Sequence, residues 1–274
     1  MSTIRILLYL FLSSFLLHPA EGQEYSRIIS LAPSLTKNLV FLDAEDKLVG
    51  CTSYCTLTPG TEKEVVASAI TVNLEKIVSL QPDLILVMPL TNPETIASLK
   101  KFGIRLEMFP SPRSFDEICE QFVYLGKLIG KQELAEDIVM ESKAEVHKLA
   151  RTGSTGNRQR MFFQIGANPI FSVLPNTFME DYITYTGCTN IVRGMKGGII
   201  SRESVLARNP EIIFVATMGV LGEEERTIWK SYKDLKAAED DRIYIIDSDL
   251  ACLPTPLTFV QTLEIMINYL YPEK

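Results

Sequence analysis

The strongest constraint on the fold is a long stretch, Ser114–Arg151, that carries helical patterning and contains no strand. Before and after it, short apolar runs alternate with amphipathic segments. Such alternation predicts mainly parallel sheets that helices cover on both faces. The sequence therefore predicts an α/β protein of two lobes joined by one long connecting helix.

Several segments before this stretch have the composition of strands and helices. The predicted strands are Arg27–Leu31, Leu48–Thr52, Asp83–Met88 and Ile104–Phe109, and the predicted helices are Val72–Leu80 and Glu94–Phe102. Asn73 is expected to cap the first of these helices. Pro33 ends the first strand, and we expect Ser34 or Thr36 to cap a helix that follows it.

The second half repeats this rhythm. Its predicted strands are Arg160–Ile165, Ile212–Ala216 and Arg242–Ile246, and its predicted helices are Phe178–Thr186, Ser201–Ala207, Thr227–Lys230 and Leu257–Tyr269. The only tryptophan, Trp229, is expected in a surface helix. Because Gly130 breaks the preceding helix, we place the N-terminal lobe at residues 23–130, the connecting helix at 131–152 and the C-terminal lobe at 153–274.

The first 22 residues have the pattern of a secretory signal peptide. Arg5 precedes an apolar run, residues 6–17, that is too short to span a bilayer comfortably, since spanning takes ~20 apolar residues. Small residues before Gln23 predict cleavage near Gly22; an uncleaved anchor is the alternative. The first cysteine is Cys51, so no N-terminal Cys is available for a lipid anchor. We therefore expect an exported, periplasmic protein.

Charge and histidine content exclude several functions. The net charge of -7 gives no electrostatic footprint for nucleic acid. Only two histidines are present. His18 leaves with the signal peptide, and His147 stands alone in a Lys/Glu-rich helix, so no metal site is predicted.

The five cysteines leave the disulfide pairing open, because an exported chain permits disulfides. Cys51 and Cys55 are close enough in sequence to pair locally, but they could equally be small buried hydrophobic residues. The cysteines are Cys51, Cys55, Cys119, Cys188 and Cys252.

Signatures of catalysis are missing from the sequence. It contains no G-x-S-x-G elbow, no P-loop and no G-x-G-x-x-G fingerprint. Asp247 and Asp249 form a close acidic pair, but two acids in a loop are more typical of caps and turns. No catalytic residue and no cofactor are predicted, and we expect a binding protein rather than an enzyme.

Three segments resemble the helical-backbone (class III) solute-binding proteins of cobalamin and iron-complex ABC importers. They are Arg27–Ser34, Asn73–Ile85 and Ser201–Ile213. The resemblance covers nearly the whole chain after the signal peptide, and the overall pattern is closest to the cobalamin receptors. It implies a ligand cleft between the lobes, a monomer, and delivery of a metal-chelate ligand to an ABC permease with its ATPase.

The resemblance also implies a role for Glu75 and Glu203. In that family one exposed Glu on each lobe docks onto Arg residues of the permease. A carboxylate in the first turn of a helix is favoured by the helix dipole, and Arg can bind it bidentately. The alternative is that both are ordinary acidic residues at helix starts.

The same resemblance suggests ligand contacts. The metal-ion branch of the family uses several His, which this chain lacks, so a corrinoid, a ferric siderophore or haem remains. Cobalamin receptors often place Trp at positions that here correspond to Ala69, Met88 and Gly197. The predicted ligand-binding residues are Pro33, Tyr54, Met88, Phe171 and Asp249.

The other ligands would need different groups. A ferric siderophore calls for cations such as Arg113, Arg193 and Arg202, whereas haem calls for an iron ligand, for which Tyr54 is the candidate. A corrinoid is our first expectation. An exported enzyme on the same scaffold and a surface-sensing module remain as other classes.

Overall fold

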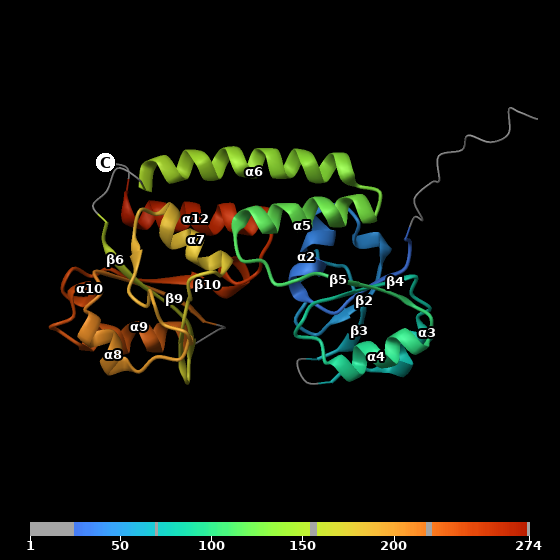
Figure 1. Ribbon diagram of the computed structural model, residues 1–274, viewed down its shortest axis with the longest axis horizontal. Coiled ribbons are helices and arrows are strands. Elements are labelled where there is room, and N and C mark those ends of the chain that lie inside the picture. The colour runs from blue at the N-terminus through green and yellow to red at the C-terminus, as the bar shows by residue number, and fades with distance from the viewer. Residues whose placement is uncertain (1–24, 69–70, 154–157, 218–220, 273–274) are drawn as a thin grey trace, which may run out of the picture.

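Two α/β lobes lie side by side beneath a layer of long helices in the computed structural model (Figure 1). The structure describes residues 25–68, 71–153, 158–217 and 221–272. The predicted signal peptide, its cleavage site near Gly22, and Ala69 lie outside these ranges. Within them, the predicted fold class is confirmed: both lobes have mainly parallel sheets, and a long helix joins them.

The N-terminal lobe contains a five-stranded, entirely parallel sheet with the order β3-β2-β1-β4-β5. Its aliphatic strand β4 is buried on both faces, which explains the continuous apolar run in its sequence. The strands are β1 (Ile28–Ser30), β2 (Leu48–Thr52), β3 (Glu64–Ala67), β4 (Leu84–Val87) and β5 (Arg105–Met108).

Helices cover both faces of this sheet. One face packs against α2 and the longer helix α5, and the other against α3 and α4. A short 3₁₀ turn, η1 (Glu45–Lys47), leads into β2. The helices are α2 (Pro33–Phe41), α3 (Leu74–Ser79), α4 (Pro93–Lys101) and α5 (Phe115–Leu128).

The sheet of the C-terminal lobe has the order β10-β9-β6-β7, and β8 also pairs with β6. The pairs of β6 with β8 and β9, and of β9 with β10, are parallel, but β7 runs antiparallel to β6. The strands are β6 (Arg160–Ala167), β7 (Ile170–Ser172), β8 (Thr189–Asn190), β9 (Ile212–Thr217) and β10 (Ile243–Asp247).

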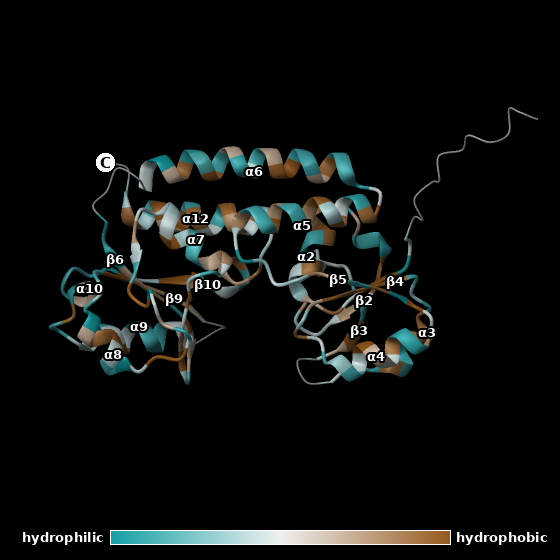
Figure 2. Cartoon of the chain, viewed as in Figure 1, coloured by the Kyte–Doolittle hydropathy of each residue, from teal (hydrophilic) through white to brown (hydrophobic). Residues whose placement is uncertain are grey.

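Helices again cover both faces. One face of the sheet packs against α7 and α12, the other against α8, α9 and α10, and the short α11 follows β10. In Figure 2 the central strands are hydrophobic, whereas the helices alternate in hydropathy along their length. The helices are α7 (Phe178–Tyr185), α8 (Arg202–Arg208), α9 (Leu221–Ser231), α10 (Lys236–Glu239), α11 (Ser248–Ala251) and α12 (Pro256–Leu270).

The helical layer ties the lobes together more extensively than one connector would. The long helix α6 (Gln132–Gly153) contributes Ala135 to the core of the N-terminal lobe and Leu149 to that of the C-terminal lobe. Helix α5 also belongs to both cores, through Phe122 and Phe115 respectively. Phe115 stacks on Phe259 of α12 with ring centroids 4.5 Å apart. Two helices thus span both lobes, which restricts their relative motion.

The structure supports one predicted cap and contradicts another. Asn73 caps α3, since its side-chain oxygen accepts a hydrogen bond from the backbone N–H of Lys76 at 2.9 Å. The prediction that Ser34 or Thr36 caps α2 is wrong. That helix begins at Pro33, whose missing N–H suits the first helical position, and Ala32 is the N-cap residue.

Trp229 lies in a helix with an exposed face, as predicted, but its side chain points inwards. This side chain is fully buried on α9, where its indole N–H donates to Gln164 Oε1 at 2.7 Å. Its ring packs edge-on against Phe162. A tryptophan has a large apolar area to bury, and here the polar N–H also finds a buried acceptor.

None of the helices within the described ranges is long and apolar enough to cross a membrane. The longest, α6, carries charged residues along its whole length.

Candidate functional site

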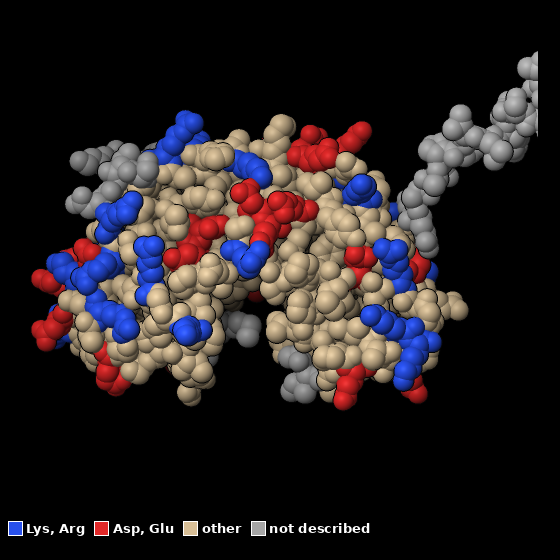
Figure 3. Space-filling model, in the orientation of Figure 1, with Lys and Arg blue, Asp and Glu red and all other residues tan. Residues whose placement is uncertain are grey.

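The carboxyl ends of the two sheets face one another. In Figure 1 the chain enters β1 from the outer side of the N-terminal lobe and β6 from the outer side of the C-terminal lobe. The parallel strands of each sheet therefore end towards the other lobe. The space-filling view is hollowed between the lobes below the helical layer (Figure 3). In open α/β sheets, loops at the carboxyl ends of strands form the binding crevice.

Two predicted contacts of the N-terminal lobe lie together at this edge. Pro33 opens α2 directly after β1, and Met88 directly follows β4. The Ser34 hydroxyl donates to the Met88 sulfur at 3.5 Å, so the two segments are in contact. Pro33 and Met88 are both half-buried, which leaves part of each side chain open to solvent. The polarisable thioether of Met88 is suited to packing against an apolar ligand.

Tyr54 lies in a tight turn after β2. The turn is closed by a hydrogen bond from the Cys55 N–H to the Thr52 carbonyl at 3.1 Å. The Tyr54 N–H donates to the Thr52 hydroxyl at 3.3 Å, which fixes the backbone. The Tyr54 side chain remains 57% exposed. A large aromatic ring on an ordered turn at the carboxyl edge is available for ligand contact.

The C-terminal lobe presents Phe171 from the β6–β7 hairpin. The ring packs over Gly198, where an added Cβ would lie 2.2 Å from a ring carbon. Ser172 and Ile170 hydrogen-bond to the backbone of residues 198–200, which holds that segment beside β7. Phe171 is nevertheless 39% exposed. An added Cβ at the neighbouring Gly197 would meet no atom within 4 Å, so this position is open.

Asp249 lies at the end of β10, in the first turn of α11. Its backbone N–H donates to Asp247 Oδ1 at 2.7 Å, so Asp247 serves as the N-cap residue, as its position in a loop suggests. The Asp249 side chain is exposed. Pro33, Tyr54 and Met88 thus follow carboxyl ends of strands on one lobe. On the other lobe Asp249 follows β10, and Phe171 lies within β7, paired with the carboxyl end of β6.

Two exposed apolar residues were missed by sequence reasoning. Leu90 lies in the turn after Met88 and is 93% exposed, and Ile199 pairs with Phe171 in an isolated antiparallel bridge and is 62% exposed. Single apolar residues in loops carry no distinctive sequence signal, since many occur on ordinary surfaces. Only their positions beside Met88 and Phe171 indicate that they could contact a ligand.

Two of the three arginines considered for an anionic ligand are paired with carboxylates. Arg113 forms an ion pair with Glu117 at 2.7 Å, and Arg202 forms one with Glu225 at 3.0 Å. Arg193 borders a cavity of the C-terminal lobe between the end of α6 and α7. On the face drawn in Figure 3, charged side chains gather over the helical layer and the outer sides of the lobes, whereas the walls of the hollow are mostly uncharged.

Glu75 and Glu203 occupy equivalent positions on the two lobes. Each lies two residues after an N-cap side chain, Asn73 for α3 and Ser201 for α8, and each is exposed. Both helices cover the sheet faces turned away from α6 (Figure 1). Hydrogen bonds from its own backbone N–H and from the Ser201 hydroxyl hold the pKa of Glu203 below its usual value. The two carboxylates therefore project from matching helix starts.

A buried polar network lies beneath α8. Glu225 accepts hydrogen bonds from Gln164 Nε2 at 2.8 Å and from an Arg202 Nη2 at 3.0 Å. The Arg202 guanidinium lies over the Trp229 ring, 4.5 Å from its centroid. Arg202 directly precedes Glu203, so the network anchors the start of that helix. The acidic run around Glu225 gave no sign in the sequence that one of its members is buried.

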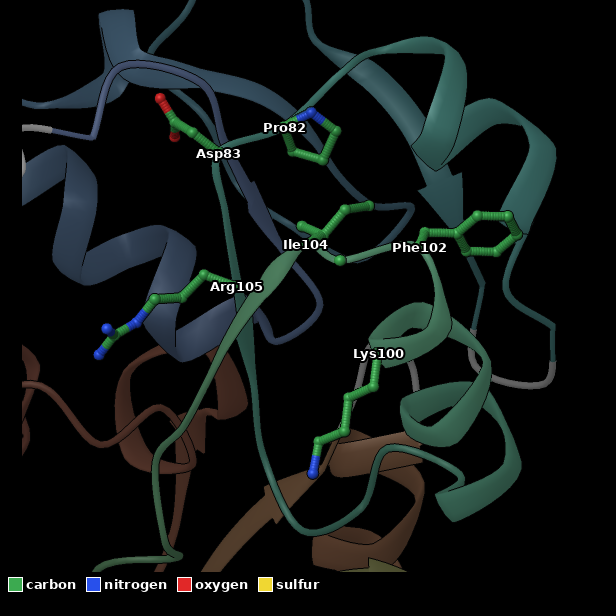
Figure 4. Close-up of a pocket in the computed structure, with 7 residues that line it drawn as sticks. Pro82, Asp83, Lys100, Phe102, Ile104 and Arg105 are labelled. Carbon is green, nitrogen blue, oxygen red and sulfur yellow. The ribbon is translucent and has the colours of Figure 1, made fainter.

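Figure 4 shows a pocket on the outer edge of the N-terminal lobe. Asp83 and Arg105 lie at the amino ends of β4 and β5, on the edge opposite the facing carboxyl ends. The labelled side chains point away from one another rather than towards a common centre. Asp83 is already used, because it accepts hydrogen bonds from the backbone N–H groups of Ser26 and Arg27. This pocket has the features of a surface depression rather than a ligand site.

Metal-binding groups do not cluster in the part of the chain that the structure describes. There, no group of three or more His, Cys, Asp or Glu side chains could hold a metal ion. His147 is exposed on α6. The facing edges consequently offer aromatic and aliphatic side chains with few charges, a combination suited to an organic ligand rather than a bare ion.

A family model described as periplasmic binding protein matches residues 28–250. The vitamin B12-binding protein of Vibrio cholerae is 28% identical over 96% of this chain and 94% of its own length. An uncharacterised ABC transporter substrate-binding lipoprotein of Bacillus subtilis is 27% identical over 92% of this chain and 82% of its own.

The crystal structure of the periplasmic vitamin B12 binding protein of Vibrio cholerae superposes with a TM-score of 0.77 at 26% identity. The match covers 90% of this chain and 96% of that one. The arrangement of two lobes and a helical layer is therefore shared with a solved protein over nearly the full length of both.

Proposed function

The chain belongs to the periplasmic binding protein family, and from that premise we propose that it captures a corrinoid between its two lobes and delivers it to an ABC importer. The observation that carries the proposal is the pair of exposed aromatic side chains, Tyr54 and Phe171, on facing carboxyl edges. A flat macrocycle gains binding energy from aromatic packing on each face.

The rest of the cleft supports an uncharged, bulky ligand. Met88, Leu90 and Ile199 add apolar surface beside the two aromatic rings. The open space at Gly197 leaves room on the C-terminal lobe where cobalamin receptors often have a Trp. Relatives named as vitamin B12-binding proteins favour the same class of ligand.

The alternatives within the family are weaker on specific grounds. A ferric siderophore would need free cations, but Arg113 and Arg202 are already paired with carboxylates. Haem would need an iron ligand, and Tyr54 is exposed and could supply one. Haem is therefore the second candidate, and the proposal treats the chain as a binding protein without catalytic activity.

Docking to the permease is assigned to Glu75 and Glu203. Their matched positions on α3 and α8 present one carboxylate from each lobe. Arg residues on a permease could bind both at once, and the rigid helical layer would fix the spacing between them. The partners in this proposal are the transmembrane subunits of an ABC importer with their ATPase, and the binding protein acts as a monomer.

Export follows from the same proposal. The segment up to Gly22 would direct the chain out of the cytoplasm and be removed, leaving a periplasmic protein that starts at Gln23. A lipoprotein among the relatives shows that membrane anchoring occurs in similar proteins. In this chain Cys51 is the first cysteine and lies within β2, so it cannot serve as an N-terminal anchor.

The test is calorimetric titration of the protein from Gln23 onwards with cyanocobalamin, followed by haem and a ferric siderophore. We expect one-to-one binding of the corrinoid and much weaker binding of the other two. Binding of haem alone, with a Tyr-to-iron charge-transfer band that disappears in Tyr54→Phe, would replace the corrinoid with haem. Binding of none of the three would overturn the ligand class.

A further inference from the structure

Two cysteines lie beside the turn that carries Tyr54 and have no part in the function proposed above. Cys51 is a buried residue of β2, and Cys55 is half-buried at the end of the turn. Both pack against the same hydrophobic core, on the α2 side of the sheet. A hydrogen bond from the Cys55 N–H to the Thr52 carbonyl, at 3.1 Å, folds the chain back between the two residues. The turn thus brings both thiols to the same side of the sheet.

The surroundings of Cys55 favour its thiolate. Its sulfur lies 3.0 Å from the Thr36 hydroxyl and 3.3 Å from the Thr52 hydroxyl. Together with the hydrogen bond from the Cys51 thiol, which is the largest contribution, these contacts lower the pKa of Cys55 despite its partial burial. The hydrogen bond to Cys55 and burial raise the pKa of Cys51. Cys55 is therefore the first nucleophile. Cys51 keeps its proton until Cys55 is in a mixed disulfide and can no longer interact with it as a thiolate.

The other three cysteines have different environments. Burial raises the pKa of Cys119 to about 12, that of Cys252 to about 11, and that of Cys188 above its usual value. None of the hydrogen bonds found in the described ranges joins two of these thiols. None of the three has another cysteine close to it in sequence, so these residues are the natural internal controls.

We propose that Cys51 and Cys55 form a reversible disulfide with a disulfide oxidant of the export compartment. The Cys55 thiolate attacks one sulfur of the oxidant and expels the first thiol, giving a mixed disulfide. Cys51 then loses its proton and attacks the Cys55 sulfur, expelling the second thiol. The pair gives up two electrons and two protons, and the oxidant gains both. Closing the bond requires a sulfur separation of ~2.05 Å, which rotation of the two side chains on the turn would supply.

The new bond would close a small ring that contains Tyr54. Because that ring includes the whole turn between the two sulfurs, oxidation would restrict the backbone that positions the aromatic side chain. This consequence for ligand binding rests on the proposed function, whereas formation of the disulfide does not. The two parts can therefore be tested separately.

The first experiment exposes the full mature chain to oxidised glutathione, blocks free thiols under denaturing conditions and maps the peptides by mass spectrometry. We expect the Cys51–Cys55 peptide to lose the mass of two hydrogen atoms and to escape blocking. Peptides with Cys119, Cys188 and Cys252 should be blocked as before. Dithiothreitol should restore blocking of the pair.

Two variants show whether the pair oxidises without the other cysteines. The triple variant Cys119→Ser, Cys188→Ser, Cys252→Ser retains only the pair and should oxidise as the wild type does. Cys55→Ser should instead leave Cys51 blocked after oxidation. Equal blocking of the pair before and after oxidant, or disulfides that involve only the other three cysteines, would overturn the inference.

The second experiment compares corrinoid affinity of the oxidised and reduced protein by calorimetry. We expect a several-fold difference that vanishes in Cys55→Ser. Equal affinity in both states would remove the regulatory part while the disulfide site stands. Absence of corrinoid binding in both states would instead count against the proposed function.

Discussion

The two lobes follow one plan but hold their outer helices differently. In the N-terminal lobe, α3 and α4 cover a purely aliphatic core through residues such as Ile77 and Leu99. In the C-terminal lobe, α8 and α9 cover a core that includes Trp229, beside an ion pair between the partly buried Arg202 and the buried Glu225. The same requirement, to fix a helix that presents an exposed Glu, is met by apolar packing on one side and by a charge network on the other.

This difference predicts that the two outer helices tolerate substitutions beneath them to different degrees. Aliphatic contacts are non-directional, so α3 can absorb small changes in side-chain volume with modest losses. Removing one member of an ion pair that is largely shielded from water leaves the other charge uncompensated, so α8 depends on the Glu225 partner of Arg202. We expect the two lobes to respond unequally to substitutions beneath α3 and α8.

The largest expected effect tests whether both lobes dock onto the permease, each through one Glu. In cells with a cognate importer, the double variant Glu75→Ala, Glu203→Ala should abolish uptake of labelled ligand and leave its affinity for the binding protein unchanged. Each single variant should lower uptake roughly thirtyfold, since removing one member of an interfacial charge pair costs more than ~2 kcal/mol. Glu94 also lies two residues after an Asn cap, on α4, so Glu94→Ala is the matched control. Unaltered uptake by the double variant would refute docking through these residues.

The next effect breaks the charge network of the C-terminal lobe. Glu225→Leu should lower the free energy of unfolding by about 3 kcal/mol, because it removes the carboxylate partner of Arg202 and one of the two hydrogen bonds that the Gln164 amide group donates. Denaturant unfolding followed by circular dichroism measures this change. Glu224 is exposed on the same helix, and Glu224→Leu should change stability by less than ~0.5 kcal/mol. Similar losses for the two variants would mean that the network contributes little.

The smallest expected effect concerns the aliphatic side of the comparison. Ile77→Val removes one buried methylene beneath α3 and should cost about 1 kcal/mol in the same unfolding experiment. Uptake should stay normal, since α3 keeps its packing and its cap. A loss as large as that of Glu225→Leu would show that the two lobes are equally sensitive after all.

Most of the fold could be predicted from local patterns. The continuous apolar run of β4, the Asn73 cap and the long helical stretch without a strand each have a local cause that is visible in the sequence. Strand β3 escaped prediction because it is short and half exposed, so it has no periodicity of its own. The antiparallel strand β7 was missed for the same reason, because only its pairing with β6 defines it.

The site could be predicted only in part. Tyr54 and Phe171 were proposed from resemblance, and their position at facing edges depends on the tertiary fold. Trp229 was expected in a surface helix, and the sequence does not show that its side chain is buried. Its burial requires Gln164, which is distant in the chain, and the partner of Glu225 is equally distant. Long-range polar pairs of this kind leave no local pattern to read.

In our proposal, both lobes bind one ligand through aromatic side chains on their facing edges. The most direct test is calorimetric titration of Tyr54→Ala, Phe171→Ala and Phe102→Ala with cyanocobalamin. Phe102 is 55% exposed, close to the value for Tyr54, but lies in the outer pocket of Figure 4. The account predicts about a tenfold loss of affinity for each of the first two variants, equal to ~1.4 kcal/mol, and no change for the third. Wild-type affinity in both Tyr54→Ala and Phe171→Ala would contradict it.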